Sequence, residues 1–202
     1  MLDPLMRRVI DGPLQRGGGW LIEAGVTANQ VTLAGFAAGL GAMAALAFQL
    51  YLPALVLIGL NRLADGLDGA VARKRGVTDL GGYLDIVLDF LFYSGVVFGF
   101  ALGRPDQALA AAFLIFAFVG TGSSFLAYAT IAAKRGLTTD LRGHKSLYYI
   151  GGLTEGSETI ALFLAICLFP DWFPWLAYGF GALCWLTTTS RILAAVEAFK
   201  DH

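Results

Sequence analysis

The fold is decided by the stretch Asp65-Gly-Leu-Asp68-Gly69-Ala-Val-Ala72-Arg73, followed after a short basic link by Gly81-Gly-Tyr-Leu-Asp85-Ile-Val-Leu-Asp89. These segments place four aspartates in sequence that is otherwise strongly apolar. Asp65 and Asp68 are spaced i,i+3, and Asp85 and Asp89 are spaced i,i+4. On two helices each pair would share a face. Two such pairs brought together have the geometry of a metal site.

The composition around this stretch is that of a membrane protein. Of the 202 residues, 57% are hydrophobic and 14% are charged, whereas soluble domains have about 45–50% apolar and about 25% charged residues. Six spans of about 20 residues would use most of the chain and leave no room for a second domain. The sequence therefore predicts an all-α integral membrane protein with six transmembrane helices, and it indicates no nucleic-acid partner.

The first 24 residues have the pattern of an amphipathic helix that lies on the membrane surface. One helical face carries the apolar residues Leu2, Leu5, Met6, Val9 and Ile10. A frayed terminus is the alternative. We expect Gly17-Gly18-Gly19 to break this helix before Trp20, an interfacial aromatic residue. The predicted organisation is an amphipathic juxtamembrane segment, residues 1–24, and a six-helix domain, residues 25–202.

The predicted spans make the acidic stretch part of a helical hairpin. Each of its two apolar runs is too short to cross a bilayer alone, so both helices must include their aspartates. With a turn near Gly76, Asp68 and Asp85 reach the same depth at about 1.5 Å per residue. On the first span, Gly35 and Gly39 allow close helix packing. The six spans are expected at residues 31–50, 50–72, 85–103, 107–133, 148–169 and 173–195.

The basic residues indicate the orientation of these spans. When loops are assigned to alternate sides, all of the 14 Lys and Arg residues except Arg104 fall on one side. Positive residues accumulate on the cytoplasmic side of membrane proteins. We therefore expect a bacterial-type inner membrane protein with both termini and the acidic hairpin facing the cytoplasm.

Four carboxylates at bilayer depth need neutralising, since each costs roughly 2.5–3.5 kcal/mol to insert. Carboxylate ligands favour Mg²⁺, Mn²⁺ or Ca²⁺ over zinc, and one or two ions would suffice. Gly69 and Ala72 leave space beside the carboxylates, and Arg73 suits phosphate oxygens. This combination predicts a pyrophosphate site. One alternative is that the acids simply pair with nearby basic residues, namely Arg62, Arg73, Lys74 and Arg75.

The acidic stretch resembles the signature of the CDP-alcohol phosphotransferases, membrane enzymes of phospholipid head-group synthesis. The matching pattern is Asp65-x-x-Asp68-Gly69-x-x-Ala72-Arg73, then Gly81-x-x-x-Asp85-x-x-x-Asp89. Its setting, on the second and third of six predicted helices behind a surface helix, also fits that family. The resemblance therefore extends over essentially the whole chain.

This resemblance implies a role for each residue of the signature. It implies that Asp65, Asp68 and Asp85 coordinate Mg²⁺ or Mn²⁺, and that Asp89 is both a metal ligand and the general base. The residues implied to line the CDP moiety are Gly69, Ala72, Arg73 and Gly81. The implied reaction is attack by an alcohol hydroxyl on the β-phosphorus of a CDP-linked lipid, such as CDP-diacylglycerol, with release of CMP.

Two features depart from the family pattern. Seven residues separate Arg73 from Gly81, where the family usually has about eight or nine, so we expect a tighter turn. Thr27-Ala28-Asn29 stands in place of the family's Thr-Pro-Asn before the first span. This substitution weakens the helix-start signal.

The acceptor alcohol is left open between two chemistries. A phosphorylated polyol such as glycerol 3-phosphate, which we favour, would bind the basic residues expected at the cytoplasmic face, namely Lys134, Arg135, Arg142, Lys145 and Arg191. An unphosphorylated or amino alcohol would suit the acids and aromatics nearby, Glu155, Glu158, Tyr148 and Tyr149. Topology alone would also explain the basic set, and helix-terminus stabilisation would explain the glutamates.

Two other classes of membrane protein are also compatible with these residues. A divalent-cation transporter would use carboxylates inside the membrane, and a non-catalytic membrane protein would bind lipid without turnover. A homodimer would suit the resemblance.

Overall fold

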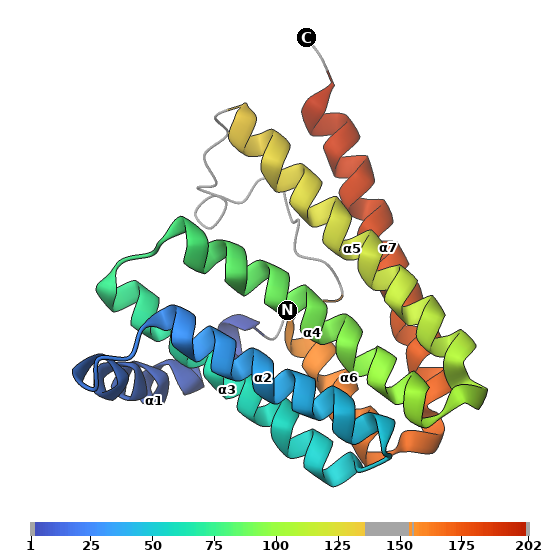
Figure 1. The fold of residues 1–202 in the computed structure, drawn as a ribbon. Helices are drawn as coiled ribbons and strands as arrows, with labels where there is room; N and C mark the ends of the chain where they lie inside the picture. Colours follow the sequence, from blue (N-terminus) through green and yellow to red (C-terminus); the bar gives the residue numbers. More distant parts are fainter. Residues whose placement is uncertain (1–2, 136–153, 155, 201–202) are drawn as a thin grey trace.

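Every regular element of the described residues is helical in the computed structural model (Figure 1). The structure describes residues 3–135, 154 and 156–200. The helices are α1 (Asp3–Glu23), α2 (Ala28–Ala47), α3 (Tyr51–Arg75), α4 (Asp79–Gly103), η1 (Pro105–Gln107), α5 (Ala108–Lys134), α6 (Gly156–Leu168), η2 (Pro170–Trp172) and α7 (Phe173–Phe199).

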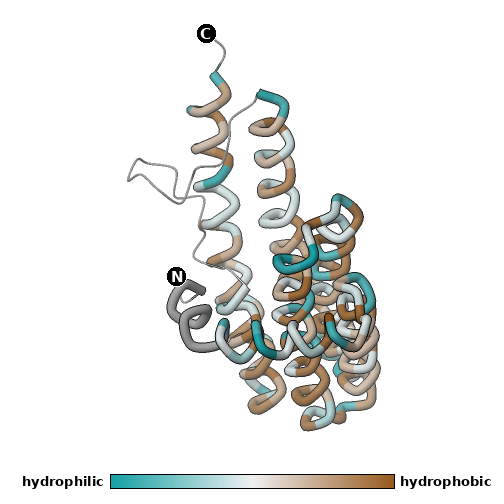
Figure 2. The backbone as a smooth tube through the Cα atoms, turned by 90° about the vertical axis from the view of Figure 1, so that its left-hand side faces the viewer, coloured by the Kyte–Doolittle hydropathy of each residue, from teal (hydrophilic) through white to brown (hydrophobic). Residues whose placement is uncertain are grey.

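Four helices of this part of the chain are long and apolar enough to cross a membrane. They are α2, α4, α5 extended back to Pro105, and α7 extended back to Pro170. Figure 2 shows apolar residues along the helices and hydrophilic residues at several of the helix ends. The all-helical membrane fold predicted from composition is thus confirmed. The predicted start of the fifth span, at residue 148, lies outside the described residues, and α6 is a shorter apolar helix.

Two groups of helices lie at an angle to each other (Figure 1). In one group α2 packs against both α3 and α4, and in the other α5 lies along α7. The two groups are joined directly by contacts of α4 with α5, and through α6, which contacts both α3 and α7. The shared core is rich in aromatic rings, among which Phe100 and Phe173 stack with centroids 4.1 Å apart.

Glycines on α2 allow the close packing that the sequence predicted. A Cβ atom added at Gly35 would lie 2.7 Å from Ala64 Cβ, and one added at Gly39 would lie 2.6 Å from Phe92 Cδ2. Such distances leave no room for a side chain at either position. The helix begins at Thr27, whose hydroxyl accepts from Gln30 N while the Gln30 side chain accepts from Thr27 N. This capping box starts the helix without the family's proline.

The prediction that the first helix breaks at Gly17-Gly18-Gly19 is wrong, because α1 continues through these residues to Glu23. The glycines instead allow α1 to approach α3: an added Cβ at Gly17 would lie 2.8 Å from Leu67 Cδ2, and one at Gly18 would lie 3.0 Å from Ala70 Cβ. Lys74 Nζ also donates to Gln15 O at 2.6 Å. These tertiary contacts offset the helix penalty of about 1 kcal/mol for each glycine.

Candidate active site

A tight turn joins the two helices that carry the aspartates. Only residues 76–78 separate α3 from α4, and Gly76 adopts a positive φ of 105° that favours glycine. Thr78 caps α4, since its hydroxyl accepts from Gly81 N at 3.1 Å. An added Cβ at Gly81 would meet Thr78 Oγ1 at 3.0 Å. Both helices continue through their aspartates, as the span lengths predicted.

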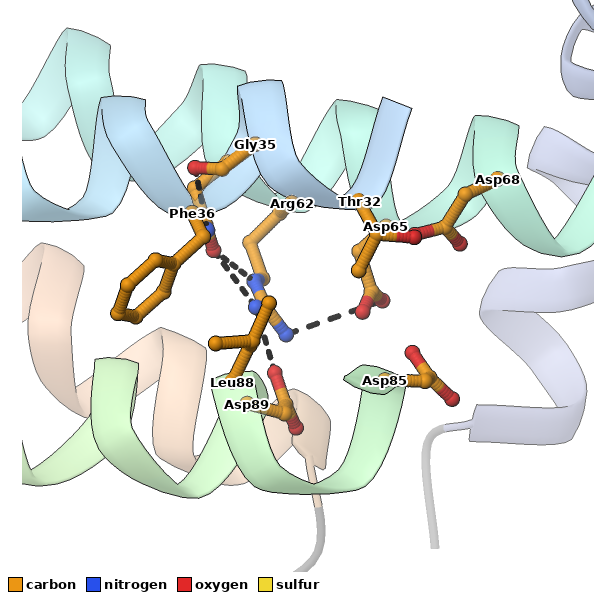
Figure 3. A pocket seen from close by; sticks show the side chains of 10 residues that line it. Thr32, Gly35, Phe36, Arg62, Asp65, Asp68, Asp85, Leu88 and Asp89 are labelled. Atoms are coloured by element: carbon orange, nitrogen blue, oxygen red, sulfur yellow. Dashed lines mark hydrogen bonds and ion pairs between the residues drawn. The ribbon is translucent and has the colours of Figure 1, made fainter. Parts of the chain in front are cut away.

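The hairpin brings all four aspartates, here called the acidic cluster, around one small cavity of about 20 Å³ (Figure 3). Asp65 and Asp68 come from α3, and Asp85 and Asp89 come from α4. Thr32, Gly35 and Phe36 of α2 form another wall of the cavity. The sequence-based expectation that the two pairs reach a common depth thus agrees with the structure.

Thr32 contacts the acidic cluster from α2 and was not singled out by sequence reasoning. Its hydroxyl donates to Asp68 Oδ2 at 2.6 Å, and Asp68 is buried. A hydrogen bond to a carboxylate is stronger than one between neutral groups. Nothing in the sequence links positions 32 and 68, which meet only because α2 packs on α3.

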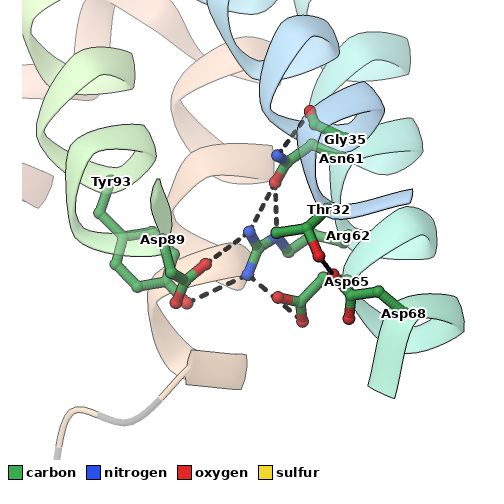
Figure 4. Close-up of polar contacts among 8 residues, drawn as sticks. All are labelled: Thr32, Gly35, Asn61, Arg62, Asp65, Asp68, Asp89 and Tyr93. Atoms are coloured by element: carbon green, nitrogen blue, oxygen red, sulfur yellow. Dashed lines mark hydrogen bonds and ion pairs between the residues drawn. The ribbon is translucent and has the colours of Figure 1, made fainter. Parts of the chain in front are cut away.

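Arg62 was considered only as a neutralising partner, and the structure places it inside the cluster (Figure 4). Its Nη2 atom lies 2.6 Å from Asp89 Oδ1, and its Nη1 atom lies 3.8 Å from Asp65 Oδ2. By contrast, Lys74 and Arg75 donate to backbone carbonyls of α1. Pairing with basic residues therefore occurs in part, through one arginine from the same helix as Asp65.

The donor chemistry of the cluster fits a hard divalent cation. Four carboxylates line one cavity, and carboxylate oxygens are the ligands that Mg²⁺ and Mn²⁺ prefer. Within residues 3–135, 154 and 156–200, no three His, Cys, Asp or Glu side chains already form a group able to hold an ion. Binding an ion therefore requires the carboxylates to draw closer than they stand here.

A second, larger cavity of about 710 Å³ begins at the acidic cluster and extends toward α5 and α7. Gly69 and Arg73 line it, whereas Ala72 and Gly81 do not. An added Cβ at Gly69 would lie 3.1 Å from Arg73 Nη1, so the missing side chain lets the guanidinium lie against the helix. The far wall carries the hydroxyl groups of Thr121, Ser123, Thr154 and Thr159.

Arg191 of α7 lines this larger cavity, as expected for an acceptor-binding residue. Its Nη1 atom donates to Thr121 O at 3.0 Å. Lys134 and Arg135 do not line it; Arg135 instead packs over the Phe199 ring at 5.3 Å. Glu158 lies in the first turn of α6 and does not line it either. The other acceptor candidates, Arg142, Lys145, Tyr148, Tyr149 and Glu155, lie outside the described residues.

An acidic helical hairpin inside a bundle of apolar helices defines a class of membrane protein, and comparison with known families identifies it. The family model for CDP-alcohol phosphatidyltransferase matches residues 25–193. The chain therefore belongs to the CDP-alcohol phosphatidyltransferase family. These are transferases of phospholipid biosynthesis, so the family resemblance seen in the signature is confirmed.

The chain is similar to an inner membrane protein and to two phosphatidylinositol phosphate synthases. The inner membrane protein YnjF of Escherichia coli K12 is 60% identical over 182 residues, which cover 90% of this chain and 88% of YnjF. Phosphatidylinositol phosphate synthase of Mycobacterium marinum is 29% identical over 192 residues, covering 91% and 75% of the two chains. The fold is similar to the crystal structure of Mycobacterium tuberculosis phosphatidylinositol phosphate synthase with CDP-DAG bound, with a TM-score of 0.58, 23% identity and coverage of 91% and 90%.

Proposed function

We propose that this protein transfers the phosphatidyl group of CDP-diacylglycerol to the hydroxyl of a small alcohol and releases CMP. The observation that carries the proposal is the acidic cluster on α3 and α4, which adjoins a cavity lined by Arg73 and Arg191. Carboxylates suit a divalent ion and guanidinium groups suit phosphates. The CDP-DAG bound to the mycobacterial structure of similar fold also supports this donor.

In this proposal Asp65, Asp68 and Asp85 hold Mg²⁺ or Mn²⁺ together with the oxygen of Asp89 that Arg62 leaves free. The ion, when bound, supplies positive charge that stabilises the pyrophosphate and the departing CMP. Arg73 binds pyrophosphate oxygens, and the surface around Gly69, Ala72 and Gly81 accommodates the cytidine part. Of these residues, Gly69 and Arg73 have the more direct support because they line the larger cavity.

The bond changes in this reaction balance without a further reactant. The acceptor oxygen forms a bond to the β-phosphorus, and the bond between that phosphorus and the bridging oxygen breaks. CMP leaves with the bridging oxygen, while Asp89 takes the hydroxyl proton of the acceptor. A positioned carboxylate of this kind typically contributes about 10²–10⁴-fold to such a step.

We propose a phosphorylated polyol as the acceptor. Arg191 provides a cation on the α7 side of the cavity, and four hydroxyl side chains nearby suit the hydroxyls of a polyol. An unphosphorylated or amino alcohol is the second candidate, but Glu158 does not line the cavity. Since Lys134 and Arg135 also lie away from it, we leave both out of the acceptor site.

For the membrane arrangement, we propose six spans with α1 on the cytoplasmic surface, and with the active site and both termini on that side. The α3 helix has 25 residues, a length of about 37 Å, enough to cross a bilayer despite its charges. We divide the chain into residues 1–24 and 25–202, a boundary that coincides with the start of the family match. A homodimer stays a prediction.

The test is to incubate the purified protein with CDP-diacylglycerol, Mg²⁺ or Mn²⁺ and a panel of alcohols, and to identify the lipid product by mass. Glycerol 3-phosphate, inositol phosphate, serine and choline form the panel. We expect CMP release with a phosphorylated acceptor and its loss in Asp68→Asn and Asp89→Asn. Metal flux into liposomes without CMP release would favour a transporter, and CDP-lipid affinity without turnover with any acceptor would favour a silent binder.

A further inference from the structure

Arg62 brings a positive charge into the acidic cluster (Figure 4). Its two terminal nitrogens approach different carboxylates, Asp89 Oδ1 at 2.6 Å and Asp65 Oδ2 at 3.8 Å. Arg62 and Asp65 belong to α3, whereas Asp89 belongs to α4. The guanidinium therefore occupies the space between the two helices on the Asp65–Asp89 side of the cluster.

Groups outside the cluster hold this guanidinium in place. Its Nε and Nη2 atoms donate to Asn61 Oδ1 at 2.8 and 2.6 Å, and the buried Asn61 donates in turn to Gly35 O at 2.8 Å. The guanidinium also lies over the Phe92 ring at 4.6 Å and donates to the Tyr93 hydroxyl at 3.2 Å. Because none of these contacts uses a carboxylate, they hold the positive charge there independently of any ion that the aspartates bind.

We propose that Arg62 is a resident cation of the acidic cluster, which takes the place between Asp65 and Asp89 and limits the cluster to a single divalent ion. This inference rests on the proposed function, which assigns the cluster to Mg²⁺ or Mn²⁺. A second ion, beside the one that the aspartates share, would have to lie on the Arg62 side of the cluster, with contacts of about 2.0–2.6 Å to Asp65 Oδ2 and Asp89 Oδ1, the oxygens that Arg62 approaches. It would then stand beside a guanidinium bonded to one of those carboxylates, and like charges repel strongly away from bulk water.

The charge of the cluster agrees with one ion. Four carboxylates line the cavity together with Arg62. Arg62 and one divalent ion together offset three of the four carboxylate charges. A second ion would leave an excess of positive charge in the cluster before any pyrophosphate arrives. The arginine thus supplies, in permanent form, charge that would otherwise be drawn from solution.

The proposal is tested by counting Mn²⁺ ions on the purified protein in detergent, with the free ion measured by electron paramagnetic resonance. We expect one Mn²⁺ per wild-type chain and two per chain for Arg62→Met, which removes the charge but keeps apolar contact with Phe92. The double variant Arg62→Met with Asp89→Asn is expected to return to one. Arg104→Met is the matched control. Arg104 follows the last residue of α4, at the opposite end of that helix from Asp85 and Asp89, and pairs with Asp171, so this variant should keep the wild-type count.

Two ions on the wild-type chain would overturn the proposal, and this measurement holds even if Arg62→Met does not fold. An unchanged count of one in a folded Arg62→Met variant would overturn it as well. A second site in Arg62→Met that persists without Asp89 would do the same, because the new ion would then lie elsewhere. The Mn²⁺ count requires no CDP-lipid or alcohol, so it can be interpreted even if the transferase assay fails.

Discussion

The hydrogen bond from Thr32 to Asp68 offers a sharp test of how α2 supports the site. Valine has nearly the shape of threonine but no hydroxyl, so Thr32→Val removes the 2.6 Å contact to Asp68 Oδ2 and, within α2, the 3.0 Å contact to Ala28 O. Asp68 is only 6% exposed, so water replaces the lost donor poorly. A hydrogen bond to a charged group contributes about 1.5–3 kcal/mol.

We expect the lower end of that range, because a bound ion would hold part of the Asp68 charge. A loss of about 1.5 kcal/mol of transition-state stabilisation lowers kcat/KM by about tenfold. The assay is CMP release at saturating metal, with thermal unfolding in detergent as the check on folding. Thr32→Ser keeps a hydroxyl and should retain most activity. Thr130→Val, on α5, removes a hydroxyl that donates to Leu126 O, four residues back along the helix, as Thr32 does to Ala28 O, and it should have no effect on activity.

A Thr32→Val variant whose kcat/KM stays within about twofold of the wild type would refute this reasoning. The same holds if Thr32→Ser loses as much activity as Thr32→Val, because the backbone or the packing of α2 would then be responsible. Packing would also be responsible if Thr32→Val and Thr32→Ser both lost activity and both had a similarly lowered unfolding temperature.

Three further predictions concern packing and metal. Gly35→Leu should destabilise the protein by about 1–3 kcal/mol, because even a Cβ at this position would lie 2.7 Å from Ala64 Cβ; the measurement is a lower unfolding temperature. The control Gly59→Ala should leave the unfolding temperature unchanged, because an added Cβ there has no atom within 4 Å. Gly18→Leu should loosen α1 from α3 and speed proteolysis of the N-terminal segment, whereas Gly12→Leu should not, because nothing surrounds an added Cβ there. EDTA should abolish CMP release and Mn²⁺ should restore it in the wild type, whereas Asp85→Asn should respond to neither, and full activity in EDTA would contradict the metal assignment.

Much of the fold follows from local features of the sequence. The charges of α3 did not prevent the prediction of its helix, because a helix expected to cross a bilayer would have to include Asp65 and Asp68. The glycine triplet in α1 shows the opposite case. Low helix propensity predicted a break, but the contact of Gly17 and Gly18 with α3 outweighed it. Propensity is local, whereas the packing that overrides it is not.

The acceptor region was less predictable. Five basic residues were equivalent candidates in the sequence, because the bias toward cytoplasmic cations supplies such residues regardless of function. Among those within the described residues, the structure separates Arg191, which lines the larger cavity, from Lys134 and Arg135, which do not. The difference depends on how α5 and α7 pack, and no spacing in the sequence reports it.

The sequence by itself determined the helical membrane class, the family signature and the meeting of four aspartates, because spacing along a helix places side chains on a face without help from other elements. Tertiary structure alone decided what surrounds those aspartates. Thr32 reaches Asp68, and the Asn61 that holds Arg62 reaches Gly35 O, only because the glycines of α2 let it pack closely on α3 and α4. The charges of the site are thus local, but their partners are products of packing between helices.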